Sequence, residues 1–565
     1  MKKQSFKRLA FVAVVGTLVS SCATLGDLEY TVTPCPLEMH GDMVKVKVDV
    51  VVPEKKGIGK KIVAEITPTL GGVALKSITI QGPKATGNGI VIDTKTGGKF
   101  TYEDEIAYAP AFENSELMVT GTISKNGKKK DDIDPFKICD GTIITPWLVN
   151  KDYKVTLATD NFERTTNEST AAQLNYAKGK SDVRSTELKD DDIKAYGDWL
   201  ASAQTNPKIA IKNVAITGFA SPEGEEDKNG TLSKDRSESA AVACKALATK
   251  AENETAAGEI YSLSSSGSDY PGFKKALLAD EKMKEDEKQL ILRVLDMSTG
   301  PDQIEVELRN MRQTFTYLDR SIFPLLRRSE IKTSYVLTGF SDEELKSNSV
   351  SNPDTLNLEE LLFTAGLYDD LSEKLRVYMI AEARFGDDYR PSNNVGAILY
   401  MQNKVSEAKA KFTKAAGIKD NPITSNNLGA IAGVEGDRVK ARSLLNQGSG
   451  AETNYNHGIL DVLDGEYGDA VSHLGSDASF NKALAEMLNG NASAVNGIVN
   501  NSADAETAQG YYLKAVAAAR QDKLDDAVNN IKSAIAKDGS YKAKAAKDRE
   551  FLKYFENASF TAIVK

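Results

Sequence analysis

Val395-Gly396 opens a pattern of small and large apolar residues that recurs through the last third of this 565-residue chain. The first copy continues with Leu399, Ala408, Phe412 and Ala415. The copies are spaced by about 33 residues, which is typical of stacked pairs of α-helices. The later copies, of which the last two are weaker, contain Leu428-Gly429, Ala441 and Leu445, then Gly458, Ala470 and Leu474, and then Ala515, Ala518, Ala527, Ile531 and Ala534.

This pattern resembles the tetratricopeptide repeat (TPR), a helix-turn-helix unit of about 34 residues. The resemblance implies an all-α, TPR-like solenoid over residues 354–565, with residues 359–385 as the helix pair that starts it. In such a solenoid, small residues let the two helices of a unit approach, and we expect the large residues to fill the groove of the next unit. Solenoids of this kind usually present a concave surface to peptides or proteins, so a protein partner is expected.

Four asparagines fall on the first helices of their predicted units, where TPR proteins often line the concave face: Asn393, Asn394, Asn426 and Asn427. Their amides suit hydrogen bonding to the backbone of a bound polypeptide, which makes them candidate partner-binding residues. Alternatively they satisfy neighbouring turns, or the array is only structural. The sequence leaves these possibilities open.

Residues 148–340 differ from the repeats, because helical and strand signals alternate along them. Apolar residues at helical spacing, and short apolar runs between turn residues, identify the elements. In chain order the sequence predicts a helix over 191–203, a strand over 214–218, a loop over 218–224, a helix that begins at its N-cap Ser233 and carries Arg236, and a strand from Arg327 to Leu337.

Four features of this region resemble the OmpA-like C-terminal domain and occur in the same order. They are a strand ending at Gly218, a short loop ending at Gly224, the helix start Asn229-x-x-Leu232-Ser233-x-x-Arg236, and the closing strand Arg327-Arg328-x-Glu330-Ile331. The resemblance implies a mixed α/β sandwich with a β-α-β-α-β plan. It also implies non-covalent binding of peptidoglycan through the diaminopimelate of its stem peptide.

That family clamps its ligand between an Asp of the first loop and the Arg of the helix start. Arg236 matches the arginine, and a guanidinium suits bidentate recognition of a carboxylate. Ser221 stands in the place of the aspartate, and Glu223 is a nearby acid that could compensate. Together with Asn229, these are the candidate peptidoglycan-binding residues. The alternative is a scaffold role in which Arg236 pairs with an acid such as Glu223 or Asp235.

The region is longer than a plain OmpA-like domain. The extra residues, roughly 249–329, separate the helix of Arg236 from the closing strand, and two helices are predicted within them, over 289–297 and 303–318. An insertion of this size could cover or replace the ligand pocket.

Residues 22–147 predict an all-β, antiparallel sandwich. Val44-Lys45-Val46-Lys47-Val48-Asp49-Val50 alternates strictly, which places the valines on one face of a half-buried strand. Residues 33–42 and this strand resemble the N-terminal module of large Bacteroidota outer-membrane lipoproteins. Cys35 and Cys139 flank the region and are candidates for a disulfide in an oxidising compartment, with two free thiols as the alternative.

Residues 1–21 resemble a bacterial lipoprotein signal peptide. A cationic start precedes the apolar stretch 9–18, which is too short to span a bilayer. Ser20-Ser21-Cys22 is the ending that lipoprotein signal peptidase reads. The resemblance implies that Cys22 is acylated and anchors the mature protein in a membrane, and Ala23 favours the outer membrane. The alternative is an ordinary secretory signal.

Composition narrows the function classes. A formal net charge of -9 argues against broad binding of nucleic acid. The three histidines are too few and too scattered for a His-rich zinc site or a Ser-His-Asp arrangement. The sequence has no nucleotide loop, metal-ligand cluster or nucleophile elbow. We therefore expect neither an enzyme nor a cofactor.

Two functions are expected from these features. The first is a lipid-anchored envelope scaffold that tethers the outer membrane to the cell wall, to a protein partner, or to both. The second is a surface-exposed antigen or a subunit of a secretion or uptake complex, with a degenerate OmpA-like domain that does not bind peptidoglycan. The missing loop aspartate favours the second, whereas Arg236 favours the first. The few acidic residues after Cys22 favour a periplasmic orientation.

Overall fold

The computed structural model describes residues 28–257 and 259–565. They belong to two compact units, one made of the chain up to Thr159 together with Tyr368–Lys565, and the other of Asp160–Leu367. The predicted signal peptide and the lipidation site Cys22 lie outside the described residues. Within the described ranges, no helix has the length and hydropathy that crossing a membrane requires.

The N-terminal domain consists of two β-sheets. In the first, β3 (Met43–Val52) is central and pairs with β1 (Glu29–Val32), β2 (Met39–His40) and β8 (Gly98–Ala107). The second has the order β10 (Lys128–Asp140), β9 (Glu116–Lys125), β4 (Ile62–Leu70), β6 (Ile78–Gln81) and β7 (Ile90–Val91), with β5 (Val73–Ala74) paired to β4.

The alternation predicted for the valine strand is present in β3. Val44, Val46 and Val48 are buried, and the lysines between them are exposed. The three valines share one apolar core with Leu70 and Leu117, which belong to the other sheet. The two sheets therefore pack face to face around alternating residues, as a β-sandwich does.

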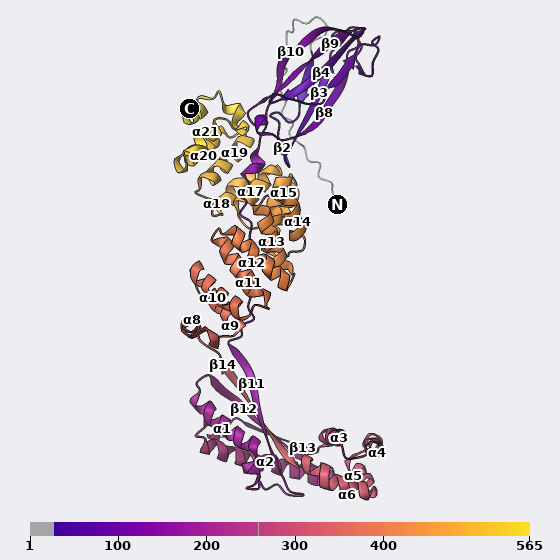
Figure 1. Cartoon of the computed structure of the whole chain (residues 1–565), viewed down its shortest axis with the longest axis vertical. Helices are drawn as coiled ribbons and strands as arrows, with labels where there is room; N and C mark the ends of the chain where they lie inside the picture. The colour runs from indigo at the N-terminus through magenta and orange to yellow at the C-terminus, as the bar shows by residue number, and fades with distance from the viewer. Residues whose placement is uncertain (1–27, 258) are drawn as a thin grey trace. The chain divides into compact units, whose positions relative to one another are not determined.

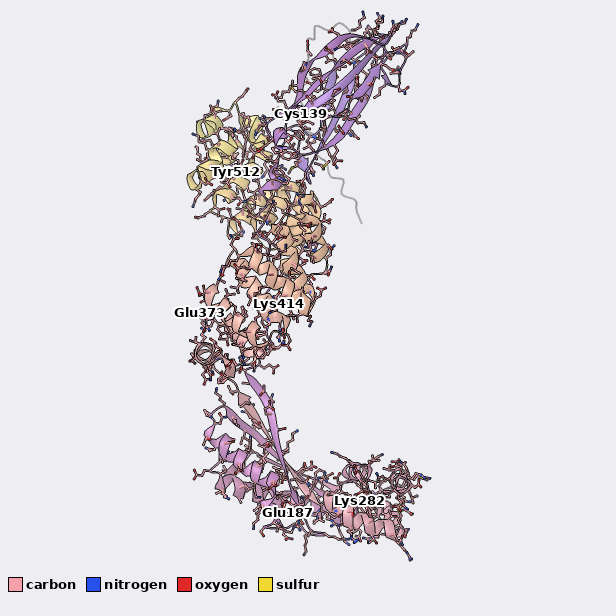
Figure 2. The ribbon with its side chains drawn as sticks, in the orientation of Figure 1. Cys139, Glu187, Lys282, Glu373, Lys414 and Tyr512 are labelled. Atoms are coloured by element: carbon pink, nitrogen blue, oxygen red, sulfur yellow. A yellow bond between two sulfur atoms is a disulfide. The ribbon has the colours of Figure 1, made fainter. Side chains whose placement is uncertain are left out.

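A disulfide joins Cys35 and Cys139, as predicted, with the Cα atoms 5.8 Å apart (Cys139 is labelled in Figure 2). The two cysteines are separated by 104 residues, so the bond closes nearly the whole β domain into one loop. In the chain-entropy account, closing a loop of about 100 residues contributes roughly 4.7 kcal/mol to stability. The remaining described cysteine, Cys244, is free and buried.

The second unit is a mixed α/β domain. Its sheet has the order β11 (Thr165–Asn175), β14 (Arg328–Thr338), β12 (Ile209–Ala220) and β13 (Tyr261–Ser268), and all pairs are antiparallel except β12 with β13. Helices α1 (Asp191–Thr205) and α2 (Glu226–Lys250) follow β11 and β12 along the chain. Ile193, Leu200 and Cys244 of these helices share a core with Val214 and Ile331 of the sheet.

Helix α2 begins earlier than the sequence predicted. It starts at Glu226, and Ser233 is therefore not an N-cap but a buried residue inside the helix, whose hydroxyl donates to the carbonyl of Gly230 (2.9 Å). The reason is electrostatic, because Glu226 and Asp227 occupy the first turn, where the helix dipole favours negative charge.

The insertion is also shorter than predicted, because β13 lies inside the range 249–329 and belongs to the central sheet. The helical insertion is confined to the residues between β13 and β14. The predicted helix over 303–318 is interrupted near Arg312, where φ is 37°. The helices are α3 (Tyr270–Ala279), α4 (Glu285–Met297), α5 (Pro301–Asn310), α6 (Gln313–Tyr317) and α7 (Phe323–Leu326).

The boundaries of the helical repeats differ from the prediction at both sides. Residues 148–159, expected in the central domain, belong to the unit of the repeats, whereas α8 (Asp342–Ser351) and α9 (Leu358–Gly366) close the central unit. The predicted helix pair over 359–385 is therefore divided between the two units. The array of the first unit starts at α10 (Leu371–Arg384).

Helices α10 to α21 stack in chain order (Figure 1). The last third of the chain is thus all-α and TPR-like, as predicted. After α10 the helices are α11 (Tyr389–Met401), α12 (Val405–Ile418), α13 (Pro422–Val434), α14 (Arg438–Leu445), α15 (Ala451–Asp464), α16 (Tyr467–His473), α17 (Phe480–Leu488), α18 (Val495–Asn500), α19 (Ala508–Arg520), α20 (Leu524–Lys537), α21 (Ser540–Ala545) and α22 (Ala558–Val564).

The repeated glycines bring the two helices of each pair together. A Cβ added at Gly396 would lie 2.8 Å from the ring of Phe412, and one at Gly429 would lie 2.8 Å from the side chain of Leu445. In both cases the large residue comes from the second helix of the same pair, not from the next unit as predicted. The close approach of α11 to α12, and of α13 to α14, therefore requires a glycine, which has no side chain, at positions 396 and 429.

Polar contacts join the β domain to the array within the first unit. The hydroxyl of Thr145 donates to Glu550 Oε1 (2.5 Å), and Arg520 forms an ion pair with the same carboxylate (2.5 Å). Asp42, next to β3, forms an ion pair with Arg438 of α14. These contacts fix the point at which the chain leaves the β domain and enters the array.

Candidate polypeptide-binding groove and a closed polar network

Residues 149–159, here called the connecting segment, run along the first helices of the array. The segment has no helix and no strand pairing. Its first residues contact α17 and α19, and its last residues contact α11, so it runs opposite to the chain order of the helices. Val149, Tyr153 and Ala158 are buried, and the first two belong to the apolar core of the array.

Four asparagines, one from each of four successive first helices, bind the backbone of this segment in the same way. We call Asn394, Asn427, Asn456 and Asn481 the asparagine ladder. Each accepts a hydrogen bond from one backbone N–H through Oδ1 and donates through Nδ2 to the carbonyl of the same residue. The N–H and carbonyl distances are 2.7 and 2.9 Å for Ala158, 2.7 and 2.8 Å for Thr156, 2.6 and 2.8 Å for Lys154, and 2.8 and 2.9 Å for Asn150.

All four bound residues have even numbers, and this is what an extended chain requires. In an extended chain successive residues direct their backbone groups to opposite sides, so every second residue offers both its N–H and its C=O to one edge. The asparagine amide thus replaces a neighbouring strand. The donor and the acceptor of the amide match the C=O and the N–H of one residue. The contact therefore does not discriminate between side chains.

The other two predicted asparagines hold the ladder in place. Asn393 accepts from Asn427 Nδ2 (2.8 Å), and Asn426 accepts from Asn456 Nδ2 (3.0 Å). Both also donate to the segment, to the carbonyls of Thr156 and Lys154, respectively. All of these side chains are almost completely buried, so the ladder amides are fixed in orientation by one another.

Asn393, Asn394, Asn426 and Asn427 are therefore brought together as a backbone-binding group. They do not serve neighbouring turns, and the polypeptide that they bind is part of the same chain. The sequence prediction missed Asn456 and Asn481. A signal was present, because Asn394, Asn427 and Asn456 each stand two residues before a repeat glycine.

Tyr153 is the side-chain anchor of the segment. Its ring lies over Gly433 of α13, where an added Cβ would come within 2.5 Å of Cζ. Its carbonyl accepts from the hydroxyl of Tyr400 (2.9 Å). The Tyr153 hydroxyl is buried and has no hydrogen-bond partner among the described residues, and this burial raises its pKa to about 12.

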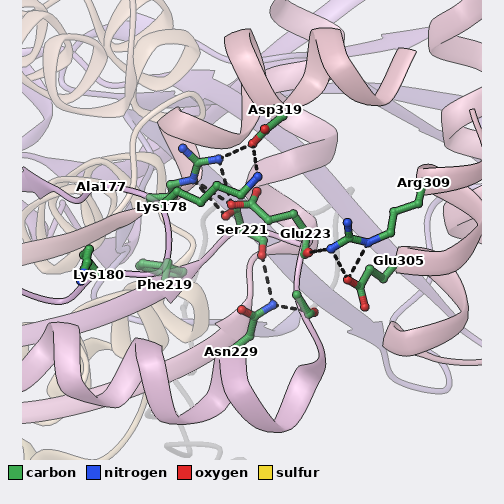
Figure 3. A network of polar contacts seen from close by, with 12 residues as sticks. Ala177, Lys178, Lys180, Phe219, Ser221, Glu223, Asn229, Glu305, Arg309 and Asp319 are labelled. Atoms are coloured by element: carbon green, nitrogen blue, oxygen red, sulfur yellow. Dashed lines mark hydrogen bonds and ion pairs between the residues drawn. The ribbon is translucent and has the colours of Figure 1, made fainter. Parts of the chain in front are cut away.

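The candidate peptidoglycan residues form a second polar group, in the central unit. Ser221, Glu223 and Asn229 of this group are labelled in Figure 3. Arg236 is completely buried, and its guanidinium donates to three backbone carbonyls: that of Lys180 (3.0 Å), that of Phe219 (2.8 Å) and that of Ala177 (3.3 Å). Burial lowers the pKa of Arg236 to about 10. The guanidinium therefore faces backbone rather than a ligand carboxylate or a neighbouring acid.

Ser221, Glu223 and Asn229 lie in the same region but are also engaged. Arg327 donates through Nε to Glu223 Oε1 (3.0 Å) and approaches the hydroxyl of Ser221 (3.4 Å). Asn229 donates to the carbonyls of Ser221 (3.1 Å) and Gly224 (2.9 Å). The loop that would receive the ligand is thus held by the chain's own side chains.

One contact joins the helical insertion to this loop, and another joins it to the start of α2. Arg309 of α5 donates to the carbonyl of Glu223 (2.6 Å), and the N–H of Glu226 donates to Asp302 Oδ1 (3.2 Å). Arg309 and Glu223 are seen side by side in Figure 3. Among the described residues, no group of three or more His, Cys, Asp or Glu side chains is arranged to hold a metal ion.

Comparison with known proteins adds little. No protein-family model matches the sequence, and no curated protein matches it. A tetratricopeptide repeat protein from Parabacteroides merdae is similar in structure, with a TM-score of 0.28 and 16% identity over 38% of this chain and 91% of that chain. The APC/C hetero-tetramer Cut9-Hcn1 gives a TM-score of 0.24 and 10% identity over 49% of this chain and 50% of that chain. Similarities this low do not establish a shared architecture.

Proposed function

We propose that the protein is a non-enzymatic scaffold of the bacterial envelope that acts through protein–protein interaction. The observation that supports this most is the asparagine ladder, because it binds a polypeptide by its main chain along successive helices of the array. Proteins built of stacked helix pairs commonly bind other proteins along the surface of the array. In this proposal the array supplies the binding surface, and the other parts of the chain determine where in the envelope the array is held.

The envelope location rests on the N-terminal sequence and on the disulfide. The lipoprotein-like ending at Cys22 supports a lipid anchor at the outer membrane. The bond between Cys35 and Cys139 supports an oxidising compartment, because structural disulfides are rare in the cytosol. A lipid anchor would raise the effective concentration of the array near membrane-bound partners.

For the central unit we favour an OmpA-like domain that does not bind peptidoglycan. The strand and helix order supports the resemblance, and the closed polar network argues against a free pocket. Arg236, the residue expected to meet a carboxylate, has its donors directed at backbone. This favours the subunit of an envelope assembly over the tether to the cell wall.

Fractionation of the envelope distinguishes these roles. Envelopes would be extracted with mild detergent, and the peptidoglycan sacculus would be separated by centrifugation. We expect the protein in the supernatant, in an assembly larger than the 61.1 kDa chain. Recovery with the sacculus would support the wall tether instead, and recovery as a soluble monomer would contradict a scaffold role.

A further inference from the structure

We propose that the connecting segment is an internal ligand, and that the external ligand of the same groove is an extended polypeptide segment with an aromatic residue, preferably Phe, at the position of Tyr153. The partner would take the place of residues 149–159 on the asparagine ladder. This inference rests on the proposed protein-interaction role and names the chemical class of the partner.

Recognition in the groove is directed mainly at the backbone. The ladder makes eight hydrogen bonds to N–H and C=O groups of the segment, and any extended polypeptide without proline at the four bound positions could form the same eight. Main-chain hydrogen bonds of this kind provide affinity, and pockets for particular side chains provide specificity. The groove therefore has the properties of a receptor for extended polypeptides.

The surroundings of residue 153 suit phenylalanine better than tyrosine. Gly433 leaves space for the ring, but the buried Tyr153 hydroxyl has no partner among residues 28–257 and 259–565. A buried hydroxyl without a hydrogen bond weakens binding, by roughly tenfold. A ligand with Phe at this position avoids that loss, so the internal ligand is not the best one that the groove can hold.

The segment is also open to solvent on its outer side. Lys151, Asp152, Lys154 and Thr159 are exposed, so at these positions the segment faces solvent within the described part of the chain. Its tether gives it an effective concentration of about millimolar or above, which an incoming ligand must exceed in affinity. Exchange is then a competition between two ligands for one backbone-binding site.

Binding of synthetic peptides tests this proposal. A labelled peptide of residues 147–160, with Phe at position 153, would be titrated into the full chain and into the variant Tyr153→Gly/Thr156→Pro. The variant's own segment loses its anchor and one ladder donor, because proline has no N–H. We expect the variant to bind the peptide at least tenfold more tightly than the wild type does, and the Phe peptide to bind about tenfold more tightly than the Tyr peptide.

N-methylated peptides provide a matched control. Methylation at Thr156 removes an N–H that Asn427 accepts (2.7 Å), whereas the N–H of Val155 makes no hydrogen bond in the described part of the chain. Loss of binding only with the methyl group at Thr156 is expected. Equal binding of the two peptides would overturn the proposal, as would no binding to a folded variant.

If the double variant does not fold, the wild type provides the second measurement. At millimolar peptide, hydrogen exchange of its own residues 149–159 should accelerate, and unchanged exchange would overturn the proposal. A negative result in the peptide titration or in the hydrogen-exchange measurement would not change the result expected from the envelope fractionation. A scaffold that binds its partner through another surface would therefore be distinguished from a protein that is not a scaffold.

Discussion

Replacing Arg236 by alanine is expected to lower the stability of the central unit by about 3–5 kcal/mol. The substitution removes the donor from three buried carbonyls, those of Ala177, Lys180 and Phe219, and leaves a cavity where the largest fully buried side chain was. The measurement is urea unfolding of the full chain, followed as the separate transition of the central unit, because several domains do not unfold as one two-state system.

Lys234→Ala is the matched control on the same helix. Lys234 is exposed, and its ion pair with Glu238 (3.8 Å) lies at the surface, so its loss should change stability by less than about 0.5 kcal/mol. A stable Arg236→Ala protein would contradict the scaffold role of this arginine. Should that stable protein also lose affinity for peptidoglycan that the wild type has, Arg236 would be the ligand clamp that the motif predicted.

Replacing Asn427 by alanine is expected to cost about 2–4 kcal/mol in the unit that contains the array. The N–H of Thr156 and the Oδ1 of Asn393 lose their partner, whereas the carbonyl of Thr156 loses one of two donors and keeps Asn393. Unsatisfied buried groups of this kind are costly, and the neighbouring ladder amides lose a fixed member of their network. Thermal unfolding and limited proteolysis within residues 149–159 measure the two consequences.

Asn529→Ala is the control for this substitution. Asn529 is exposed on α20, and alanine has a higher helix propensity, so the change should be neutral or slightly stabilising. If both variants unfold at the wild-type temperature and resist protease equally, the ladder does not hold the segment.

Local patterns predicted much of the fold. The repeat glycines and the large residues about sixteen positions later follow from helical packing, and the structure pairs Gly396 with Phe412 as a consequence. The valine alternation of β3 was equally readable. Strands β8 and β10 were not predicted, because their charged residues hide the alternation; Tyr102 is buried in β8, and charged residues of that strand face solvent.

Local sequence patterns predicted part of the asparagine ladder but not the segment that it binds. The asparagines on first helices predicted a backbone-binding surface, and the Asn-x-Gly spacing would have added Asn456. Nothing in residues 149–159 marks them as the ligand, since backbone recognition leaves no sequence pattern. The contacts join residues hundreds of positions apart, such as Ala158 and Asn394.

The central domain shows the same limit in another form. The motif predicted that Ser221, Glu223, Asn229 and Arg236 would lie in one region, and they do. It did not predict that Arg327 would pair with Glu223, and it indicated only from its length that the insertion could cover the pocket, not that Arg309 would bind the loop. Those contacts depend on residues from the far end of the domain.

Hydrogen exchange of the connecting segment, resolved to single residues, tests the central claim most directly. The N–H groups of Asn150, Lys154, Thr156 and Ala158 are bound by the ladder, whereas that of Val155 is not. Slow exchange at the four even positions, fast exchange at Val155, and loss of protection at Thr156 in the Asn427→Ala variant are the predicted result. Fast exchange at all of these positions in the wild type would contradict a segment held by the asparagine ladder.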